Sequence, residues 1–268
     1  MKRTIGFYGA GNMAQAIISG LINSGFYQKE EIYVYNHRYE PTLKKVEETY
    51  GIQVILREEE LFQQSDLIIF AVKPTILTQI LPQINPYLQK EHVLVSIAAG
   101  VSIQQIEKLT RPHKIIRAMP NTPAMVNQAM SSISPNKLTT QEEIQLVVDV
   151  FDSFGKAKVV SEELIDAVVG VSGSAPAYVY LFIEALADGA VLEGLPRDDA
   201  YEFATQAVLG AAKMVEDTGK HPGELKDMVT SPKGTTIAAV QSLEESNFRA
   251  SVMKAVEAAA KKNHEMNK

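Results

Sequence analysis

The 268-residue sequence contains no cysteine, which excludes disulfides, thiolate metal sites and cysteine nucleophiles, and is compatible with a reducing compartment. Its five histidines are scattered without the spacing of metal ligands, so we expect no metal site. No run of lysine or arginine is present, and the net charge is −6. These features argue against a general nucleic-acid binder, because counterion release requires a concentrated basic face.

A long hydrophobic run is also missing at the N-terminus, where the apolar stretch is short and broken by glycines. That pattern is typical of a strand and a turn rather than of a signal peptide or membrane anchor. We therefore expect a soluble, cytoplasmic protein without membrane contact. No internal repeat or low-complexity linker interrupts the chain, and 46% hydrophobic residues suffice for one large core or two moderate ones.

Apolar strand patterns alternate with helical patterns in the first part of the chain, which predicts an α/β fold with a Rossmann-like doubly wound sheet. Runs such as LIIFAV are typical of strands buried on both faces of a parallel sheet. Strands are expected at residues 4–8, 31–35, 52–55, 67–72, 92–98, 114–118, 129–134 and 156–160. Helices alone follow, at residues 164–171, 175–193, 197–217, 223–229, 232–245 and 248–263. The predicted domains are therefore residues 1–160 and an all-helical domain of residues 161–268, closely joined.

A dinucleotide fingerprint follows the first predicted strand. Residues 9–14 read Gly-Ala-Gly-Asn-Met-Ala between a strand and a helix, which matches Gly-x-Gly-x-x-Ala. Gly9 permits the tight turn, and Gly11 lets the backbone approach a pyrophosphate. A plain tight turn shares the glycines, but the strand, turn and helix context favours a dinucleotide site.

The second strand ends in Asn36-His37-Arg38. An NAD-specific site places Asp or Glu here to bind the ribose 2′-hydroxyl, whereas a neutral residue followed by basic ones accepts a 2′-phosphate. The sequence therefore favours NADPH. NADH stays the alternative if His37 and Arg38 only make the loop soluble.

Small residues lie at the carboxyl ends of later strands, where the crevice of a doubly wound sheet binds its ligand. Ala71 ends one strand and is followed by Lys73-Pro74, and Ala98-Ala99-Gly100 ends the next. These small residues would leave room for a nicotinamide. Each is also compatible with an ordinary loop, and the interpretation depends on several meeting at one edge.

A second candidate site lies in residues 221–243, HPGELKDMVTSPKGTTIAAVQSL. Ser231 suits a helix N-cap and Pro232 the first helical position, so a helix is predicted to begin there. Its unpaired first amides, at the positive end of the helix dipole, would form a seat for a small carboxylate. We assign these amides to Lys233, Gly234 and Thr235, and the surrounding hydroxyls to Ser231, Thr235 and Thr236. A plain capped surface helix would show the same local pattern.

The helix predicted at residues 175–193 is apolar on nearly every side and therefore needs burial all round. Intertwined helical domains of a dimer would bury it, and so would a central place in a monomeric bundle.

Six motifs together resemble the pyrroline-5-carboxylate reductase family, whose members catalyse the last step of proline synthesis: GFYGAGNMA, AVKP, SIAAG, MPNTP, GVSGSAPAYVY and HPGELKDMVTSPKGTTI. They occur in order over almost the whole chain. The resemblance implies a Rossmann domain and a helical domain that interlocks in a homodimer, within larger assemblies up to a decamer. It also implies a substrate site between the cofactor domain of one subunit and helices of its partner.

The resemblance implies roles for individual residues. Cofactor contacts are implied for Tyr8, Gly9, Ala10, Gly11, Asn12, Met13, Asn36, Arg38, Ala71, Val72, Lys73, Pro74, Ala98, Ala99 and Gly100. The substrate carboxylate and ring nitrogen would be held by Ser231, Gly234, Thr235 and Thr236. Lys233 stands where many relatives have a glycine, which is acceptable in a helix but not at positive φ. Glu58 stands where some relatives have an Asn beside the adenosine, and no contact is carried over to it.

The implied reaction is hydride transfer from NADPH to the C=N carbon of 1-pyrroline-5-carboxylate, a small-molecule substrate, which gives L-proline. A cyclic imine is partly protonated near neutral pH and already electrophilic, so positioning should dominate catalysis. Thr236 is the candidate catalytic residue, because its hydroxyl would hydrogen-bond the nitrogen and could relay a proton.

Three alternatives stay open. A 3-hydroxyacid dehydrogenase would need a catalytic lysine, but that family's Lys and Asn positions fall on Val179 and Ile183 here, and Lys73 at a strand end is more typical of a structural or cofactor-side residue. A non-catalytic NADPH-binding regulator would not need the carboxylate seat. A six-membered cyclic imine differs from the proposed substrate only in ring size, which pocket walls decide.

Overall fold

The computed structural model describes residues 4–266 and contains two compact units. Of the described residues, the first comprises 4–173 with 258–266, and the second Ser174–Glu257. The boundary predicted at residue 161 falls inside the first unit. One reason is that the Asn121 side-chain amide donates a hydrogen bond of 2.9 Å to the Ser172 carbonyl, which holds the segment after residue 161 to this unit.

The first unit is built on an eight-stranded sheet of order β3-β2-β1-β4-β5-β6-β7-β8. Neighbouring strands are parallel except for β6 and β7, which pair antiparallel. The strands are β1 Ile5–Tyr8, β2 Ile32–Tyr35, β3 Gln53–Ile55, β4 Leu67–Phe70, β5 Val93–Ser96, β6 Lys114–Met119, β7 Ala129–Pro135 and β8 Gly155–Val159. The order reverses between β1 and β4, which is where a doubly wound sheet opens its ligand crevice. The predicted Rossmann-like fold class is confirmed.

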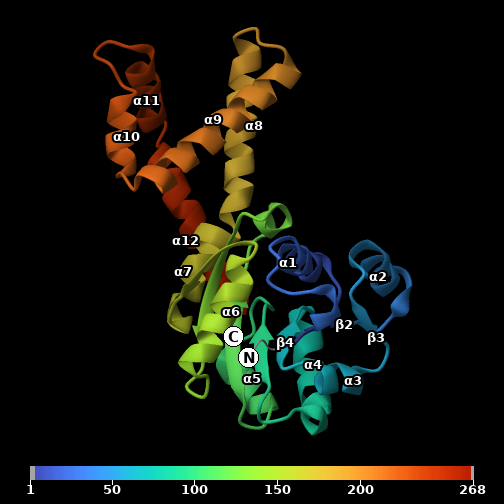
Figure 1. Ribbon diagram of the computed structural model, residues 1–268. Helices are drawn as coiled ribbons and strands as arrows, with labels where there is room; N and C mark the ends of the chain where they lie inside the picture. Colours follow the sequence, from blue (N-terminus) through green and yellow to red (C-terminus); the bar gives the residue numbers. More distant parts are fainter. Residues whose placement is uncertain (1–3, 267–268) are drawn as a thin grey trace. The chain divides into compact units, whose positions relative to one another are not determined.

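Helices cover both faces of this sheet (Figure 1). On one face, α1 (Asn12–Asn23), α2 (Lys44–Tyr50) and α6 (Gln141–Asp152) bury apolar side chains in one core cluster. On the other, α3 (Glu58–Gln64), α4 (Pro74–Ile84) and α5 (Ile103–Leu109) bury theirs in a second cluster. Strands such as β4 contribute to both clusters, which explains why the LIIF run is apolar throughout.

Short turns connect these elements: η1 Lys29–Glu31, η2 Tyr39–Leu43, η3 Asn85–Tyr87, η4 Thr122–Val126, η5 Glu162–Leu164 and η6 Val169–Gly173, with helix α7 Ile165–Val168 between the last two.

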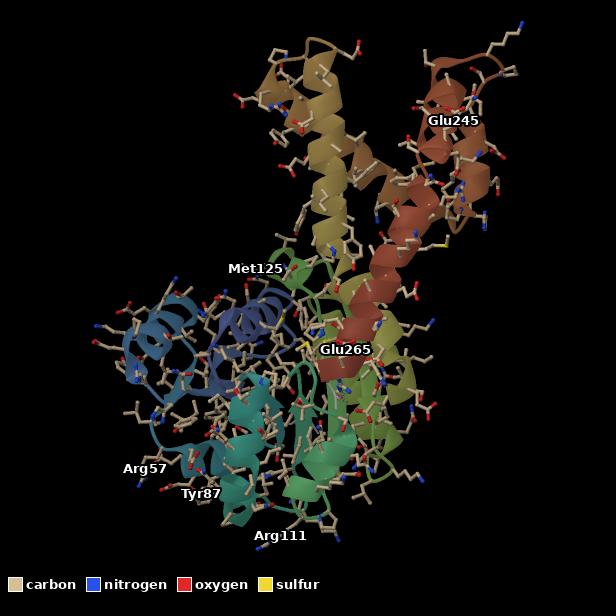
Figure 2. The ribbon with its side chains drawn as sticks, turned by 180° about the vertical axis from the view of Figure 1, so that it is seen from behind. Arg57, Tyr87, Arg111, Met125, Glu245 and Glu265 are labelled. Atoms are coloured by element: carbon tan, nitrogen blue, oxygen red, sulfur yellow. The ribbon has the colours of Figure 1, made fainter. Side chains whose placement is uncertain are left out.

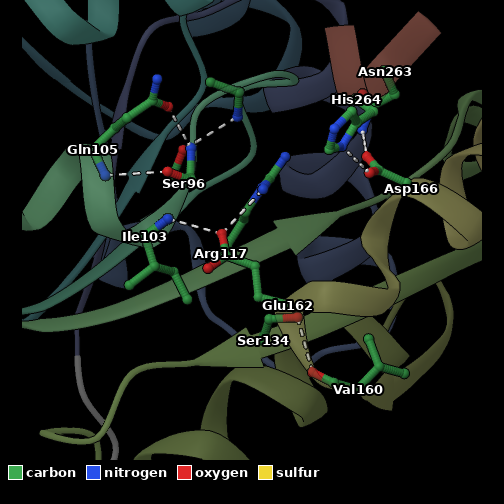
Figure 3. A network of polar contacts seen from close by, with 12 residues as sticks. Ser96, Ile103, Gln105, Arg117, Ser134, Val160, Glu162, Asp166, Asn263 and His264 are labelled. Atoms are coloured by element: carbon green, nitrogen blue, oxygen red, sulfur yellow. Dashed lines mark hydrogen bonds and ion pairs between the residues drawn. The ribbon is translucent and has the colours of Figure 1, made fainter. Parts of the chain in front are cut away.

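A polar network fixes the end of this unit (Figure 3). Arg117 on β6 is only 2% exposed, and its Nη1 lies 3.0 Å from Glu162 Oε1. The same oxygen accepts a 2.8 Å bond from the Ile103 amide at the start of α5. Asp166 in α7 accepts a 2.7 Å bond from Asn263 Nδ2, which ties the last turns of the final helix to α7.

The second unit is helical, as predicted. It contains α8 (Ala175–Leu192), α9 (Arg197–Thr218), α10 (Pro222–Met228), α11 (Thr235–Glu245) and most of α12 (Phe248–Met266). Its own buried cluster is small and consists of alanines on α8 and α9.

Large apolar side chains remain exposed on this unit within the single chain. Leu181, Leu192 and Phe203 are 67%, 87% and 68% exposed, and α8 buries only Ala187. By length and composition, Glu162–Leu192 is apolar enough to cross a membrane, with a mean hydropathy of 1.4. One chain therefore leaves most of α8 uncovered.

Candidate cofactor pocket and carboxylate seat

A pocket of about 880 Å³ lies at the carboxyl ends of β1, β2 and β4. Several residues with implied cofactor roles line it: Tyr8, Gly9, Ala10, Gly11, Asn36, Ala71, Val72 and Lys73. They come from three separate loops, which the strand order β2-β1-β4 brings to one edge of the sheet. The glycine fingerprint and the small residues after β4 therefore face a common space.

The two fingerprint glycines have different surroundings. Gly9 has a φ of 109°, and a Cβ added there would lie 2.6 Å from the Ala71 carbonyl oxygen. A Cβ added to Gly11 would have no atom within 4 Å, although Gly11 lines the pocket. The fold itself therefore requires Gly9, whereas Gly11 leaves open space at the pocket.

The start of α1 adds an anion site beside Gly11. Gly11 is the N-cap of α1, and no side chain in residues 4–266 caps this helix end. The first amides of α1 therefore lack an internal acceptor and lie at the positive end of the helix dipole. A dinucleotide pyrophosphate fits this arrangement, because it needs both close backbone approach and amide donors.

The other residues with implied cofactor roles lie near the pocket edge or outside it. Those that do not line it are Asn12, Met13, Arg38, Pro74, Ala98, Ala99 and Gly100. Asn12 and Met13 form the first turn of α1, and Pro74 opens α4. Residues 98–100 follow β5, the strand next to β4. Arg38 is exposed, and its carbonyl oxygen accepts a 2.8 Å bond from Asn36 Nδ2.

Sequence reasoning missed two other groups of lining residues. One face of α4 contributes Ile76, Gln79, Ile80 and Gln83. Their three- and four-residue spacing is that of a single helix face, and Pro74 suits the first position of a helix, so the sequence contained a signal for them. The second group surrounds Glu58 at the start of α3. The family resemblance pointed to this position without assigning it a contact, and its place at the pocket depends on the pairing of β3 with β2.

Glu58 is held by a tyrosine of β1. The Tyr8 hydroxyl donates a 2.7 Å hydrogen bond to Glu58 Oε2. Burial and then this contact raise the pKa of Tyr8 far above its usual value. Burial and then the Glu58 charge also raise the pKa of Tyr35, whose ring centroid lies 5.0 Å from that of Tyr8. Both tyrosines therefore remain neutral donors at physiological pH.

The predicted start of the seat helix at Ser231-Pro232 is wrong. Helix α11 begins at Thr235, with Gly234 as its N-cap. The Gly234 amide instead donates a 3.0 Å bond to the Ser231 carbonyl and closes a turn over Pro232 and Lys233. Proline suits the second position of such a turn as well as a helix start, so the sequence alone did not decide between them.

Lys233 has a φ of 62°, in the left-handed region that favours glycine. Lys233, which replaces the glycine of many relatives, therefore lies at a position where any residue with a side chain strains the backbone. Left-handed backbone costs a non-glycine residue roughly 1–2 kcal/mol.

The open amides of the seat are consequently those of Thr235, Thr236 and Ile237. The first internal bond of α11 joins the Ala238 amide to the Gly234 carbonyl at 3.4 Å, and no described side chain caps this end. A Cβ on Gly234 would lie 2.4 Å from Ser231 Oγ, so glycine at this position lets the serine hydroxyl lie beside the helix start. Three amides and neighbouring hydroxyls can thus receive a small carboxylate.

Comparison with known proteins identifies the family. Residues 162–266 match the model for pyrroline-5-carboxylate reductase dimerisation, and residues 4–100 match the model for NADP oxidoreductase, coenzyme F420-dependent. The chain is 50% identical over 272 residues to pyrroline-5-carboxylate reductase of Escherichia coli K12, and the match covers all of both chains.

Two solved structures resemble the whole chain. A pyrroline-5-carboxylate reductase from Coxiella burnetii matches with a TM-score of 0.95 at 33% identity and covers all of both chains. The Plasmodium falciparum pyrroline carboxylate reductase with NADP bound matches with a TM-score of 0.88 at 34% identity, covering 100% of this chain and 99% of that one. Full-length identity, both family models and the fold agree, and the chain belongs to the pyrroline-5-carboxylate reductase family.

Proposed function

We propose that the protein reduces 1-pyrroline-5-carboxylate to L-proline with NADPH as the reductant. The observation that carries the proposal is the open N-terminus of α11, where three unpaired amides and adjacent hydroxyls fit a small carboxylate. The same chain provides a dinucleotide pocket in its other unit. Relatives matched over 98–100% of the chain are named for this reaction.

The cofactor pocket would bind NADPH and orient it. Gly11 and the first amides of α1 would hold the pyrophosphate, and the face of α4 that carries Ile76 and Ile80 would form an apolar wall. Arg38 and Pro74 are proposed to contact outer parts of the nucleotide, and residues 98–100 would leave room for its nicotinamide. Bound NADPH would supply the hydride.

The seat positions the substrate. The amides of Thr235, Thr236 and Ile237 would bind the carboxylate, and Ser231 and Gly234 would shape this end of the helix. The Thr236 hydroxyl would hydrogen-bond the ring nitrogen, accepting from an iminium N–H or donating to a neutral imine. Orientation of this kind can supply up to roughly 7–11 kcal/mol of barrier reduction for well-aligned reactants.

Substitutions at one residue test this role. Thr236→Ala should lower kcat, whereas Thr236→Ser should retain most of it, because the hydroxyl is the required group. Near wild-type kcat and KM in Thr236→Ala would contradict the assignment.

A 3-hydroxyacid dehydrogenase is not favoured. The residues at that family's Lys and Asn positions, Val179 and Ile183, are apolar side chains of α8, and Ile183 packs against the small cluster of the helical unit. Neither can move a proton.

The oligomeric state extends the proposal. The match to a dimerisation family over residues 162–266 gives the chain a dimerisation domain. We propose that two such domains interlock, cover the exposed side chains of α8 and place the seat of one subunit at the cofactor pocket of its partner. Larger assemblies up to a decamer would be built from these dimers, and the enzyme would work in the cytoplasm.

The reaction is tested with purified protein, 1-pyrroline-5-carboxylate and NADPH, followed by cofactor oxidation. Parallel reactions contain NADH, or the six-membered cyclic imine, or a 3-hydroxyacid with the oxidised cofactor. Rapid turnover of the five-membered imine supports the proposal. NADPH binding without turnover of that imine would contradict it and favour a regulator or another substrate.

A further inference from the structure

An acidic residue is missing at the end of β2 but reaches the cofactor pocket from another element. Asn36 and His37 follow β2 and line the pocket, and neither is acidic. Glu58, the first residue of α3, lines the same pocket. Because β3 pairs with β2, the loop after β3 lies at the same edge of the sheet as the end of β2.

The Glu58 carboxylate is fixed in place. Tyr8 donates to its Oε2 at 2.7 Å and is the sole residue of the described chain that hydrogen-bonds this carboxylate. The Tyr8 ring packs against Tyr35, the last residue of β2, with 5.0 Å between ring centroids. A carboxylate has two oxygens, so Oε1 remains an acceptor for a ligand.

Among the described residues no ion pair joins Glu58 to a basic side chain, although Arg57 and Lys73 line the same pocket. Arg57 lies on the outer loop before α3 (Figure 2), its side chain is 68% exposed, and it pairs with Glu59 at 3.6 Å and with Glu60. Arg38, the basic residue expected to attract a 2′-phosphate, does not line the pocket. The pocket wall at the start of α3 therefore contains a carboxylate held in place by Tyr8.

We propose that Glu58 determines nucleotide specificity by favouring the free ribose 2′-hydroxyl of NADH and opposing the 2′-phosphate of NADPH. A 2′-hydroxyl donates to a carboxylate oxygen, whereas a phosphate and a carboxylate repel each other at short range in a partly buried site. Glu58 thus acts from α3 as the acidic residue after β2 acts in NAD-specific sheets. The enzyme should consequently use NADH more readily than the basic residues after β2 predict.

This inference rests on the cofactor site of the proposed function but not on the identity of the imine. Its test is the dissociation constant of each reduced nucleotide, measured from nicotinamide fluorescence. The chain contains no tryptophan, so no indole emission overlaps the signal.

Glu58→Gln removes the charge and keeps an oxygen that can accept from Tyr8. We expect the Kd of NADPH to fall at least about tenfold, because the repulsion is gone, and the Kd of NADH to rise a few-fold, because a charged acceptor becomes neutral. The control is Glu60→Gln, which makes the same charge change on the same helix at a residue that does not line the pocket. It should leave the ratio of the two Kd values within about twofold of wild type.

Three results would overturn the inference. Equal changes for both nucleotides would mean that Glu58 contacts a part they share, such as the adenine. An unchanged ratio of the NADPH and NADH Kd values would mean that Glu58 has no role in specificity. An equal shift of this ratio in Glu60→Gln would mean that the effect comes from the overall charge of α3 and not from Glu58 in particular. Thermal unfolding checks that each variant is folded, and Glu58→Ala, expected to shift the ratio in the same direction, replaces a variant that is not. Nucleotide binding without imine reduction would refute the proposed function and still leave the ratio measurable.

Discussion

The two fingerprint glycines give the sharpest prediction, because the same substitution should do different things at each. Gly9→Ala places a methyl 2.6 Å from the Ala71 carbonyl oxygen at a φ of 109°. Unfavourable backbone and overpacking each cost roughly 1–3 kcal/mol. We therefore expect Gly9→Ala to lower the free energy of unfolding by about 2–5 kcal/mol.

Gly11→Ala places its methyl where no atom lies within 4 Å. The free energy of unfolding should change by less than about 0.5 kcal/mol, as for other open surface sites. The methyl enters the space of the pyrophosphate, however, and would displace it from the amides of α1. Loss of one charge-assisted hydrogen bond costs roughly 1.5–3 kcal/mol, which corresponds to a NADPH Kd raised about ten- to hundredfold.

Urea unfolding followed by circular dichroism measures the first quantity, and nicotinamide fluorescence measures the second. The account expects Gly9→Ala to be unstable and Gly11→Ala to be stable but weak in NADPH binding. Wild-type affinity in a stable Gly11→Ala would refute the placement of the pyrophosphate at this turn.

Three further outcomes are expected. Lys233→Gly should raise the free energy of unfolding by about 0.5–1 kcal/mol, because it removes left-handed strain, whereas Lys226→Gly inside α10 should lower it by about 1 kcal/mol; equal losses at both would contradict the turn. Glu162→Gln should cost about 1–2 kcal/mol in urea unfolding, because the buried Arg117 guanidinium loses its charged partner, and an unchanged midpoint would show that the ion pair contributes nothing. Burial lowers the pKa of His92, whose Nδ1 accepts a 3.0 Å bond from a backbone amide. The stabilisation by neutral His92 is therefore present above pH 6.5 and is lost as pH falls through the lower folded-state pKa. The free energy of unfolding, measured between pH 7 and 5, should decline, and His92→Gln should reduce that decline.

Local sequence signals were sufficient to predict the bounds of an element whose ends are set by its own residues. The sequence predicts helices near residues 58–64 and 103–109, and α3 and α5 have these bounds. For α5 the reason is a capping box in which Ser102 and Gln105 satisfy each other's backbone amides. The continuous apolar run of β4 likewise reflects burial on both faces.

The seat helix shows where local reasoning fails. Ser231-Pro232 satisfies both a helix start and the first half of a turn, and the choice is made by the hydrogen bond from the Gly234 amide to the Ser231 carbonyl. In the turn that this bond closes, Lys233 has a positive φ, which its side chain alone would not predict. The seat therefore begins three residues later than the pattern of caps indicates.

The cofactor pocket could be predicted only in part. Gly9 and Gly11 act through the turn that contains them, so their motif located them. Glu58 reaches the pocket because β3 pairs with β2. Arg38 falls outside the lining, although Asn36 and His37, which precede it after β2, line the pocket. Such placements depend on strand order and on neighbouring side chains such as Tyr8, which a linear pattern does not contain.

The most direct test of the proposed reaction follows the hydride itself. Purified protein is given 1-pyrroline-5-carboxylate and NADPH carrying deuterium at the transferred position of the nicotinamide C4, and the product is analysed by mass spectrometry and NMR. The account predicts L-proline with deuterium at C5, the former C=N carbon. Unlabelled proline, deuterium at another carbon, or no proline despite bound NADPH would contradict it.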